Sequence, residues 1–192
     1  MMSVQSISKA ELCRRKIEGC YREFGFIETA RRMVRELTRS LKKSDVDLDI
    51  SLVTKDLAIG AAPRSSHSIN RLRDLGFRRV IDLRAERNQS DILMNTGDFL
   101  VQWIPIYDDW RPKPLEVYQK LGIEIKKVLF SEDGGKLFIC CGAGEHRAPL
   151  AGVLALVTMG YPLEHAIAMI VKARPKAELL PAYKTSIVEF LR

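Results

Sequence analysis

The sequence predicts an α/β fold in which a central, mostly parallel sheet is flanked by helices on both faces, with a helical N-terminal extension. From residue 50 onward, short apolar runs typical of strands alternate with longer segments of helical periodicity. Such alternation implies parallel strands that are covered on both faces of the sheet. Residues 9–43 contain no proline and repeat apolar residues every three or four positions, which predicts helix.

The helical extension contains an apolar repeat that Gly25 interrupts. The repeat comprises Ile17, Tyr21, Phe24, Ala30, Val34, Leu37 and Leu41. It is equally consistent with one long bent helix and with two helices that meet near Gly25. We expect its apolar stripe to pack on the rest of the protein and its charged side chains to remain in solvent. Residues 44–51 contain the expected connector.

The segment that follows predicts a hairpin, a helix and two strands. The expected elements are strands at Ile50–Val53 and Leu57–Gly60, a helix that begins after Ser65 and Ser66 and ends at Gly76, and strands at Arg79–Leu83 and 101–106. Helix start and stop signals agree for this helix.

The last part of the chain predicts four helices and one strand. They are a helix at Pro114–Phe130, a strand at 136–141, an apolar helix at Arg147–Met159, a helix opened by Pro162 and ended by Pro175, and a helix at Ala182–Leu191. The expected division is an extension of residues 1–48 and an α/β catalytic domain of residues 49–192.

The net charge of +7 is concentrated near the N-terminus, where residues 1–43 hold 11 Lys and Arg against 5 Glu. A solvated helix face is one explanation, and weak association of residues 9–43 with an anionic membrane surface is the alternative. Nucleic acid is not an expected partner, because no aromatic platform accompanies the charge. No apolar run reaches about 18 residues and the N-terminus is polar, so we expect a cytoplasmic location.

The four cysteines are Cys13, Cys20, Cys140 and Cys141, and their spacing does not resemble a disulfide framework. We therefore expect thiols. The three histidines complete no ligand set with these cysteines, so no metal site is predicted.

The strongest functional pattern is the segment from Cys141 to Arg147. Cys141 ends a predicted strand, Gly142 and Gly144 allow a tight turn, and Arg147 begins a predicted helix. A short loop that enters a helix N-terminus directs backbone N–H groups and the helix dipole at one point, which favours a thiolate and binds oxyanions. The planar guanidinium of Arg147 can hold two phosphoryl oxygens at once.

Spacing alone would make C-x5-R a weak signal, but only Cys141 both follows an apolar strand and precedes a long apolar helix. The competing interpretation treats Cys141 as a small buried hydrophobic residue at a strand end, with the glycines merely forming a turn.

The loop CGAGEHR resembles the signature loop of the protein tyrosine and dual-specificity phosphatase superfamily, and the small dual-specificity group fits best. The likeness extends over about residues 50–192, through DLAIGAAP, INRLRDLGFRRVIDLR, IPIYDDWRPKPLE and IVKARPKAELLPAY. It implies a phosphocysteine intermediate without metal or organic cofactor. It also implies that the phosphoryl group binds at Gly142, Ala143, Gly144, Glu145, His146 and Arg147.

The resemblance further implies an aspartate that protonates the leaving oxygen, about 30 residues before the cysteine. Asp108 and Asp109 both stand there, and the D-x-x-P spacing of Asp109 and Pro112 favours Asp109. A turn-forming aspartate is the structural alternative for either residue.

Three positions depart from the family pattern. Cys140 replaces a histidine that normally hydrogen-bonds the loop, and Ala148 replaces a hydroxyl that helps the thiolate leave. Glu145 places a carboxylate where relatives that act on inositol phosphates often have Lys or Arg. These departures predict slower turnover and disfavour highly charged inositol substrates.

Two further residues have open roles. For His146, a local hydrogen bond or an outward orientation competes with a role as general base. For Arg174, a solvated helix end competes with steering of an anionic substrate.

The predicted function is therefore hydrolysis of phosphate monoesters, as in protein tyrosine and dual-specificity phosphatases, on a phosphoprotein or a small phosphate monoester. The alternatives are a catalytically impaired phosphate-binding module and a phospholipid-headgroup phosphatase. A rhodanese-like sulfurtransferase also uses a loop cysteine, but the Asp-Trp-Arg-Pro segment disfavours it.

Overall fold

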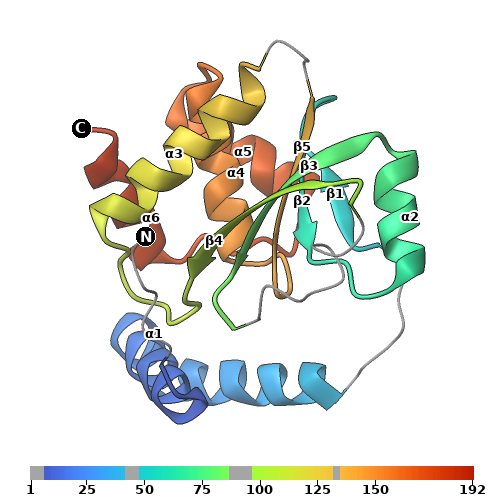
Figure 1. The fold of residues 1–192 in the computed structure, drawn as a ribbon. Helices are drawn as coiled ribbons and strands as arrows, with labels where there is room; N and C mark the ends of the chain where they lie inside the picture. The colour runs from blue at the N-terminus through green and yellow to red at the C-terminus, as the bar shows by residue number, and fades with distance from the viewer. Residues whose placement is uncertain (1–6, 42–47, 87–96, 132–134) are drawn as a thin grey trace.

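A computed structural model describes residues 7–41, 48–86, 97–131 and 135–192. The strands in these ranges are β1 (Ile50–Leu52), β2 (Leu57–Ala61), β3 (Phe77–Arg84), β4 (Leu100–Ile106) and β5 (Lys136–Cys141). They form one sheet in the order β1-β2-β5-β3-β4 (Figure 1). Only the β1–β2 pair is antiparallel among these strands, which confirms the predicted mostly parallel sheet.

Helices cover both faces of this sheet, as predicted (Figure 1). One face packs against α2 (Ser66–Asp74), and the other packs against α3 (Leu115–Leu129), α4 (Arg147–Thr158), α5 (Leu163–Ala173) and α6 (Pro181–Phe190). Successive side chains of β5 therefore point to opposite faces of the sheet. Ile139 and Cys141 join the core under α4, whereas Phe138 and Cys140 join the core under α2. The sheet is therefore buried on both sides.

The predicted helix boundaries have recognisable local causes. The Ser65 side chain accepts a hydrogen bond from the backbone N–H of Ser68 and so caps α2. Helix α4 is apolar around most of its circumference because it is enclosed by the sheet and its neighbouring helices. Pro162 lies one position before α5 rather than at its first position.

The extension forms α1 (Lys9–Leu41), whose two helical halves meet at Gly25. Gly25 has φ 75° and ψ −179°, a conformation that residues other than glycine rarely adopt. Helix α1 lies across the end of the domain toward which β4 points (Figure 1). The expected domain boundary after residue 48 stays a prediction, because residues 42–47 of the connector lie outside the described ranges.

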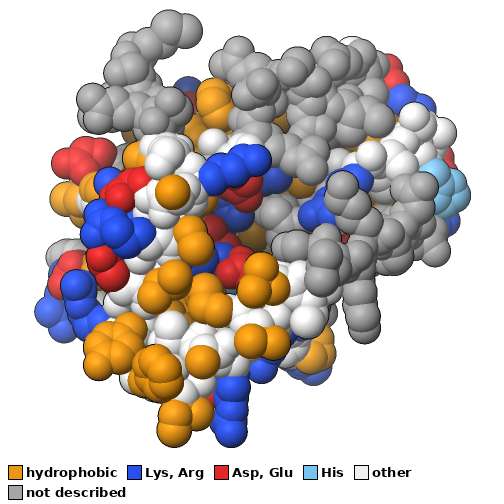
Figure 2. Space-filling model, turned by 90° about the horizontal axis from the view of Figure 1, so that it is seen from below, with side chains coloured by type: hydrophobic (Ala, Val, Ile, Leu, Met, Phe, Trp, Pro, Cys, Tyr) orange, Lys and Arg blue, Asp and Glu red, His pale blue; other side chains and the backbone are white. Residues whose placement is uncertain are grey.

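The expected packing of the apolar stripe of α1 is wrong for most of the stripe, although Phe24 does pack against the core. Ile17, Tyr21, Val34 and Leu37 are 42%, 59%, 59% and 66% exposed. Figure 2 views the molecule from the side on which α1 lies, and hydrophobic side chains gather there beside Lys and Arg. No described helix is both long and apolar enough to cross a membrane.

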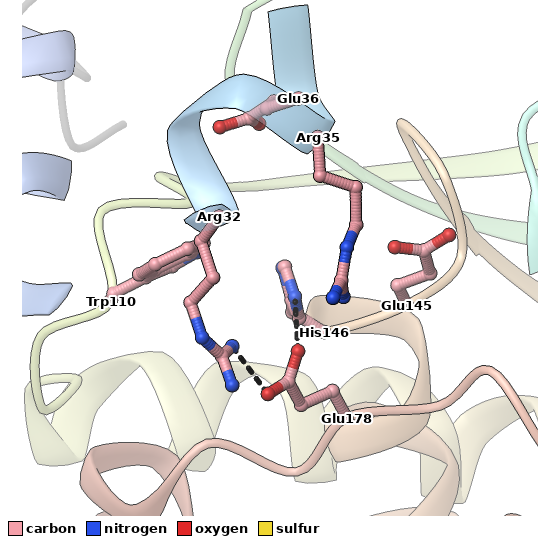
Figure 3. Close-up of a pocket in the computed structure, with 7 residues that line it drawn as sticks. All are labelled: Arg32, Arg35, Glu36, Trp110, Glu145, His146 and Glu178. Atoms are coloured by element: carbon pink, nitrogen blue, oxygen red, sulfur yellow. Dashed lines mark ion pairs between the residues drawn. The ribbon is translucent and has the colours of Figure 1, made fainter. Parts of the chain in front are cut away.

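The face of α1 toward the domain carries Cys20, Phe24 and Met33, and also polar side chains that form ion pairs there. Arg32 forms an ion pair with Glu178, and its guanidinium lies 4.0 Å from the ring centroid of Phe24 and 5.6 Å from that of Trp110. Figure 3 shows this ion pair between Arg32, on α1, and Glu178 in the lining of a pocket that α1 helps to enclose. The ion pair and ring contacts compensate for burying charge, so polarity alone does not decide which face is covered.

Candidate active site

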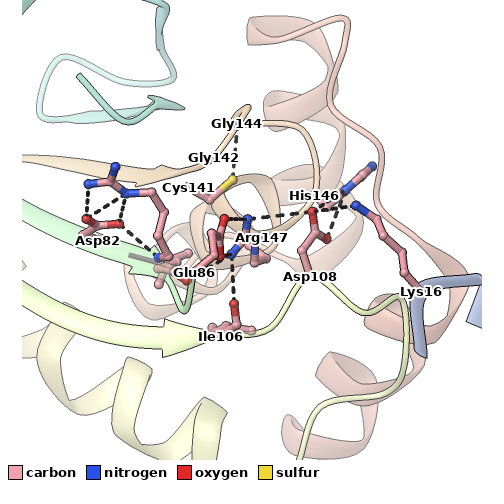
Figure 4. A network of polar contacts seen from close by, with 12 residues as sticks. Lys16, Asp82, Glu86, Ile106, Asp108, Cys141, Gly142, Gly144, His146 and Arg147 are labelled. Carbon is pink, nitrogen blue, oxygen red and sulfur yellow. Dashed lines mark hydrogen bonds and ion pairs between the residues drawn. The ribbon is translucent and has the colours of Figure 1, made fainter. Parts of the chain in front are cut away.

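Four polar side chains meet where neighbouring parallel strands end. Cys141 is the last residue of β5, Glu86 follows β3, Asp108 follows β4, and Arg147 begins α4 (Figure 4). In open α/β sheets the crevice outside the carboxyl ends of the strands is the usual binding site. The predicted loop from Cys141 to Arg147 lies at this edge.

The loop turns back on Cys141 at Gly144. The backbone N–H of Gly144 donates a hydrogen bond to Sγ of Cys141 at 3.2 Å. Gly144 has φ 69°, and a Cβ atom there would lie 2.4 Å from the carbonyl carbon of Gly60, so the turn requires glycine. This hydrogen bond fixes the position of the sulfur relative to the loop backbone.

Arg174 holds the loop from behind. It is 2% exposed, and its Nε and Nη2 donate hydrogen bonds to the carbonyl oxygens of Gly144 (2.5 Å) and Ala143 (3.0 Å). Its other contacts are with the Asp49 carboxylate and the Ser51 hydroxyl. Arg174 is therefore neither a solvated helix end nor a group directed at substrate. These bonds fix the carbonyl oxygens of Ala143 and Gly144. The backbone N–H of Gly144 is directed at Cys141 instead.

Arg147 is buried and firmly oriented. Its Nη1 and Nη2 donate hydrogen bonds to the Glu86 carboxylate, both at 2.7 Å, and Nη1 also donates to the Ile106 carbonyl at 3.0 Å. Burial alone would lower the pKa of Arg147, but Asp108 and Glu86 outweigh burial and raise it well above its usual value. Burial likewise opposes the ionised form of Glu86, but Arg147 outweighs it and lowers the Glu86 pKa.

The open side of the Arg147 guanidinium is its Nε. This nitrogen is buried and has no hydrogen-bond partner among the described residues. A buried N–H without an acceptor is costly, and a bound anion would satisfy it. Glu86 occupies the Nη1/Nη2 end of the guanidinium, so the Nε edge is the part available to an oxyanion.

The two candidate acids have different partners. Asp108 Oδ2 lies 3.8 Å from Arg147 Nη2. Asp109 is 7% exposed and forms an ion pair with Lys113. Trp110, which directly follows Asp109, adopts φ 56°, a value that is rare for a residue other than glycine. The side chain beside the loop is therefore that of Asp108.

Asp108 has cations and donors around it. Oδ1 lies 3.2 Å from His146 Nδ1 and accepts a hydrogen bond from the Tyr183 hydroxyl at 3.3 Å, and Oδ2 lies 3.7 Å from Lys16 Nζ. Burial favours the neutral acid, but His146, Arg147 and Lys16 outweigh burial and hold the Asp108 pKa well below its usual value. In the protein without ligand, Asp108 is therefore ionised at neutral pH.

His146 points inward and contacts Asp108, rather than pointing outward into solvent. It is 9% exposed, and its Nε2 lies 3.6 Å from Glu178 on the side opposite Asp108. Burial alone would lower the His146 pKa, but Asp108 and Glu178 outweigh it and raise the pKa to about 9. The imidazolium charge binds the catalytic loop to both carboxylates. A general base would need the neutral form, so this environment disfavours that role.

A pocket lies between α1 and the catalytic loop (Figure 3). Its lining residues are Arg32, Arg35, Glu36, Trp110, Glu145, His146 and Glu178. Its empty volume is about 320 Å³, including open solvent. Figure 3 shows the side chain of Arg35 extending into it from α1. Glu145, the carboxylate expected in the loop, lines this pocket rather than the Arg147 edge.

Helix α1 also contacts the segment that carries both aspartates. A Cβ atom at Gly19 would lie 2.9 Å from the carbonyl oxygens of both Asp109 and Trp110, so the helix approaches this backbone closely. Glu18 forms an ion pair with Arg111 in the same segment. The N-terminal extension is thus part of the wall of the candidate site.

Sequence reasoning located the loop residues Gly142, Ala143, Gly144, Glu145 and His146, and the structure places them together between Cys141 and Arg147. Glu86, Lys16 and the anchoring role of Arg174 were missed. The Arg-Pro pair at 174 was a visible signal, but no local pattern connects it to the loop.

The chain matches no protein-family model and no curated protein. Solved structures do resemble it. Human DUSP28 has a TM-score of 0.63 and 21% identity, over 77% of this chain and 95% of that one. A mouse putative dual specificity phosphatase complexed with zinc tungstate has a TM-score of 0.64 and 19% identity, over 78% and 90%. PTPMT1 in complex with PI(5)P has a TM-score of 0.62 and 17% identity, over 73% and 93%. The chain therefore has the fold of the dual-specificity and tyrosine phosphatases.

Proposed function

We propose that the protein hydrolyses phosphate monoesters through a phosphocysteine intermediate, in the manner of protein tyrosine and dual-specificity phosphatases. The supporting observation is the open Nε edge of Arg147 at the loop in which the Gly144 N–H meets Cys141 Sγ. A nucleophile and an unsatisfied cationic donor on one rigid loop are the two parts that phosphoryl transfer requires.

In the first step, Cys141 Sγ attacks phosphorus and the bond from phosphorus to the leaving oxygen breaks. An aspartic acid donates its proton to that oxygen, so the alcohol leaves neutral. The Arg147 guanidinium and the backbone of residues 142–147 hold the phosphoryl oxygens. In the second step, water attacks phosphorus and gives a proton to the same aspartate, and the thiolate of Cys141 is released.

We assign the acid to Asp108, because its carboxylate is the one beside Arg147. Asp109, which the D-x-x-P spacing favours, stays the alternative. The low pKa of Asp108 in the unliganded protein is compatible with this role. A bound phosphate places negative charge next to Asp108 and engages the charge of Arg147, and both effects raise the Asp108 pKa toward the value an acid needs.

Two alternatives keep specific support. The buried Ala148 lacks the hydroxyl that relatives use at this position, which favours a phosphate-binding module with little turnover. A phospholipid headgroup is the second alternative, and the solved PTPMT1 structure contains PI(5)P. Three carboxylates, from Glu36, Glu145 and Glu178, line the adjacent pocket and offset the cations of Arg32, Arg35 and His146, so the lining has no cationic excess for a highly charged inositol phosphate.

A phosphorylated protein or small phosphate monoester is thus the proposed substrate, and the proposed steps use only side chains of this chain. The expected cytoplasmic location and the division into residues 1–48 and 49–192 accompany this proposal.

The test measures para-nitrophenyl phosphate hydrolysis and vanadate binding by the full chain. We expect Cys141→Ser to abolish hydrolysis and to retain vanadate binding, whereas Arg147→Lys should weaken both, because an ammonium does not reproduce the guanidinium geometry. Cys140→Ser is the matched control, because Cys140 faces the opposite core. Unchanged hydrolysis in Cys141→Ser would refute the phosphocysteine route. Vanadate binding by a wild-type protein that hydrolyses none of a panel of phosphotyrosine, phosphoserine and phospholipid substrates would favour the binding module.

A further inference from the structure

One face of α1 exposes large apolar side chains although the rest of the domain is well packed. We call it the outer face and define it by Tyr21, Phe26, Ile27, Val34 and Leu37, which are 59%, 76%, 69%, 59% and 66% exposed. Figure 2 shows hydrophobic side chains gathered on this side of the molecule. Single exposed apolar residues are ordinary on protein surfaces, but a group on one helix marks an interaction surface.

The arrangement of the outer face is regular. In the second half of α1, Ile27, Val34 and Leu37 recur at seven and three residues, the spacing of one helix face. Phe26 and Ile27 directly follow the bend at Gly25, so the two most exposed apolar side chains of α1 lie at the corner of the helix pair. A bulky aromatic and an aliphatic residue at a corner can enter a soft apolar layer without displacing the rest of the fold.

Cations accompany this apolar surface. The side chain of Arg31 is 72% exposed and pairs with Glu28 in the same helix. Cations are in excess at the exposed described positions of α1, which are Lys9, Arg14, Arg22, Arg31 and Arg35 against Glu23. Residues 1–43 carry 11 Lys and Arg against 5 Glu in the sequence. An apolar helix face with neighbouring Arg residues matches the two components of an anionic bilayer surface, the acyl boundary and the acidic headgroups.

We propose that the outer face of α1 docks the protein on an anionic membrane surface. This surface uses none of the residues of the proposed phosphatase site, so the docking stands independently of that function. The inner face of the same helix contacts the segment of Asp108 and Trp110, and docking therefore brings the candidate site close to the membrane.

A second copy of the chain fits this face less well. Pairing of two outer faces would bring together two surfaces with the same excess of exposed cations, and like charges across an interface oppose association. An anionic bilayer gains from the same charges.

The first experiment is flotation of the full chain with vesicles of phosphatidylcholine alone and of phosphatidylcholine with phosphatidylserine. We expect binding only to the anionic vesicles and a decrease as salt rises. The double variant Phe26→Ser, Ile27→Asn should reduce binding about 10-fold or more. The matched control is Leu100→Asn, Phe130→Ser, which alters two side chains that are 68% and 67% exposed outside α1 and should bind as wild type does.

The second arm changes the charge. Arg22→Glu, Arg31→Glu should weaken binding to phosphatidylserine vesicles, whereas Lys55→Glu, Lys127→Glu, which alters exposed lysines outside α1, should have little effect. Unfolding temperatures of all variants establish that they fold, and para-nitrophenyl phosphate turnover should be equal in solution. Lack of wild-type flotation, or equal losses in the control variants, overturns the proposal. Sedimentation as a dimer that Phe26→Ser, Ile27→Asn dissociates, without vesicle binding, assigns the face to a second copy instead.

Discussion

Arg174 donates a hydrogen bond from Nη2 to the carbonyl oxygen of Ala143 at 3.0 Å, and thereby holds the catalytic loop from a position 31 residues later in the chain. The same guanidinium contacts both oxygens of the Asp49 carboxylate, at 3.1 and 3.0 Å. Arg174 thus connects the loop after β5 with the segment that precedes β1.

Replacement of Arg174 by Met should therefore disorder the loop. It leaves two loop carbonyls and a carboxylate without their donor, and loss of one partner of such a buried set costs about 3 kcal/mol of unfolding free energy. Urea unfolding and vanadate binding measure the two effects. Lys172→Met, at an exposed position in the last turn of α5, two residues before Arg174, serves as control. Normal vanadate affinity in Arg174→Met would show that the loop holds its shape without this anchor.

The two aspartates should differ in their effect on leaving-group dependence. Asp108→Asn should lower kcat/KM by about 10²- to 10⁴-fold with alkyl phosphates and far less with para-nitrophenyl phosphate, whose leaving group needs little protonation. Asp109→Asn should mainly lower stability, because it breaks the buried ion pair with Lys113. Steady-state kinetics with both substrates gives the ranking, and the reverse order would reassign the acid to Asp109.

The stability of the protein should depend on the charge of His146. Its pKa rises from 6.5 to about 9 on folding, so the stabilisation is fully present below pH 6.5 and is lost as pH rises through about 9. Each unit of pKa difference between the folded and unfolded states contributes about 1.4 kcal/mol, so this shift changes the free energy of unfolding by about 3 kcal/mol. Urea unfolding at both ends of this range measures it. His146→Asn should remove most of this dependence, whereas His165→Asn, at an exposed position, should retain it. An equal pH dependence in His146→Asn would contradict the assignment.

Helix α1 should tolerate no side chain at Gly19. Because a Cβ atom there meets two backbone oxygens at 2.9 Å, Gly19→Ala must displace the helix or the segment from Asp109 to Trp110, at a cost of about 1–3 kcal/mol. We also expect lower turnover of alkyl phosphates. Gly122→Ala in α3 is the matched control, because its Cβ would have no neighbour closer than 4.0 Å. Thermal unfolding and kinetics should separate the two variants, and equal behaviour would argue against close packing of α1 on the site.

Ala148 should limit the second chemical step. A hydroxyl at this buried position can assist departure of the thiolate only when the phosphocysteine breaks down. Wild-type protein should therefore show a burst of para-nitrophenol close to the enzyme concentration in rapid mixing, and then a slow steady rate. Ala148→Ser should raise the steady rate about 10-fold and leave the burst rate nearly unchanged. Absence of a burst in both proteins would mean that breakdown of the intermediate is not rate-limiting.

The parts that sequence could predict have local determinants. The strand, the glycines and the helix that shape the loop from Cys141 to Arg147 follow one another directly, so their pattern predicts the turn. The alternation of strands and helices likewise predicted the sheet and its two covered faces. Strand order depends on contacts between segments that are distant in sequence, and the sequence did not predict it.

The remaining features depend on distant partners. Glu86 meets Arg147 across 61 residues, and nothing around position 86 distinguishes it from a surface glutamate. Asp108 and Asp109 differ by one position, so spacing alone does not decide that Asp108 meets Arg147 and that Asp109 pairs with Lys113. For α1, periodicity indicated a helix but not which face is buried, because Arg32 finds its carboxylate partner in Glu178.

The residues that anchor the loop from Cys141 to Arg147 are synthesised after the loop itself. A ribosome adds Cys141 and Arg147 well before Arg174, whose hydrogen bonds fix the loop carbonyls, and Glu178, whose backbone N–H bonds the Glu145 carbonyl at 2.7 Å. Until those residues emerge, the nascent chain contains the cysteine and the arginine without the contacts that orient them. The proposed phosphate site therefore forms late in translation, and a chain released before Arg174 would contain Cys141 and Arg147 without the contacts that orient the loop between them.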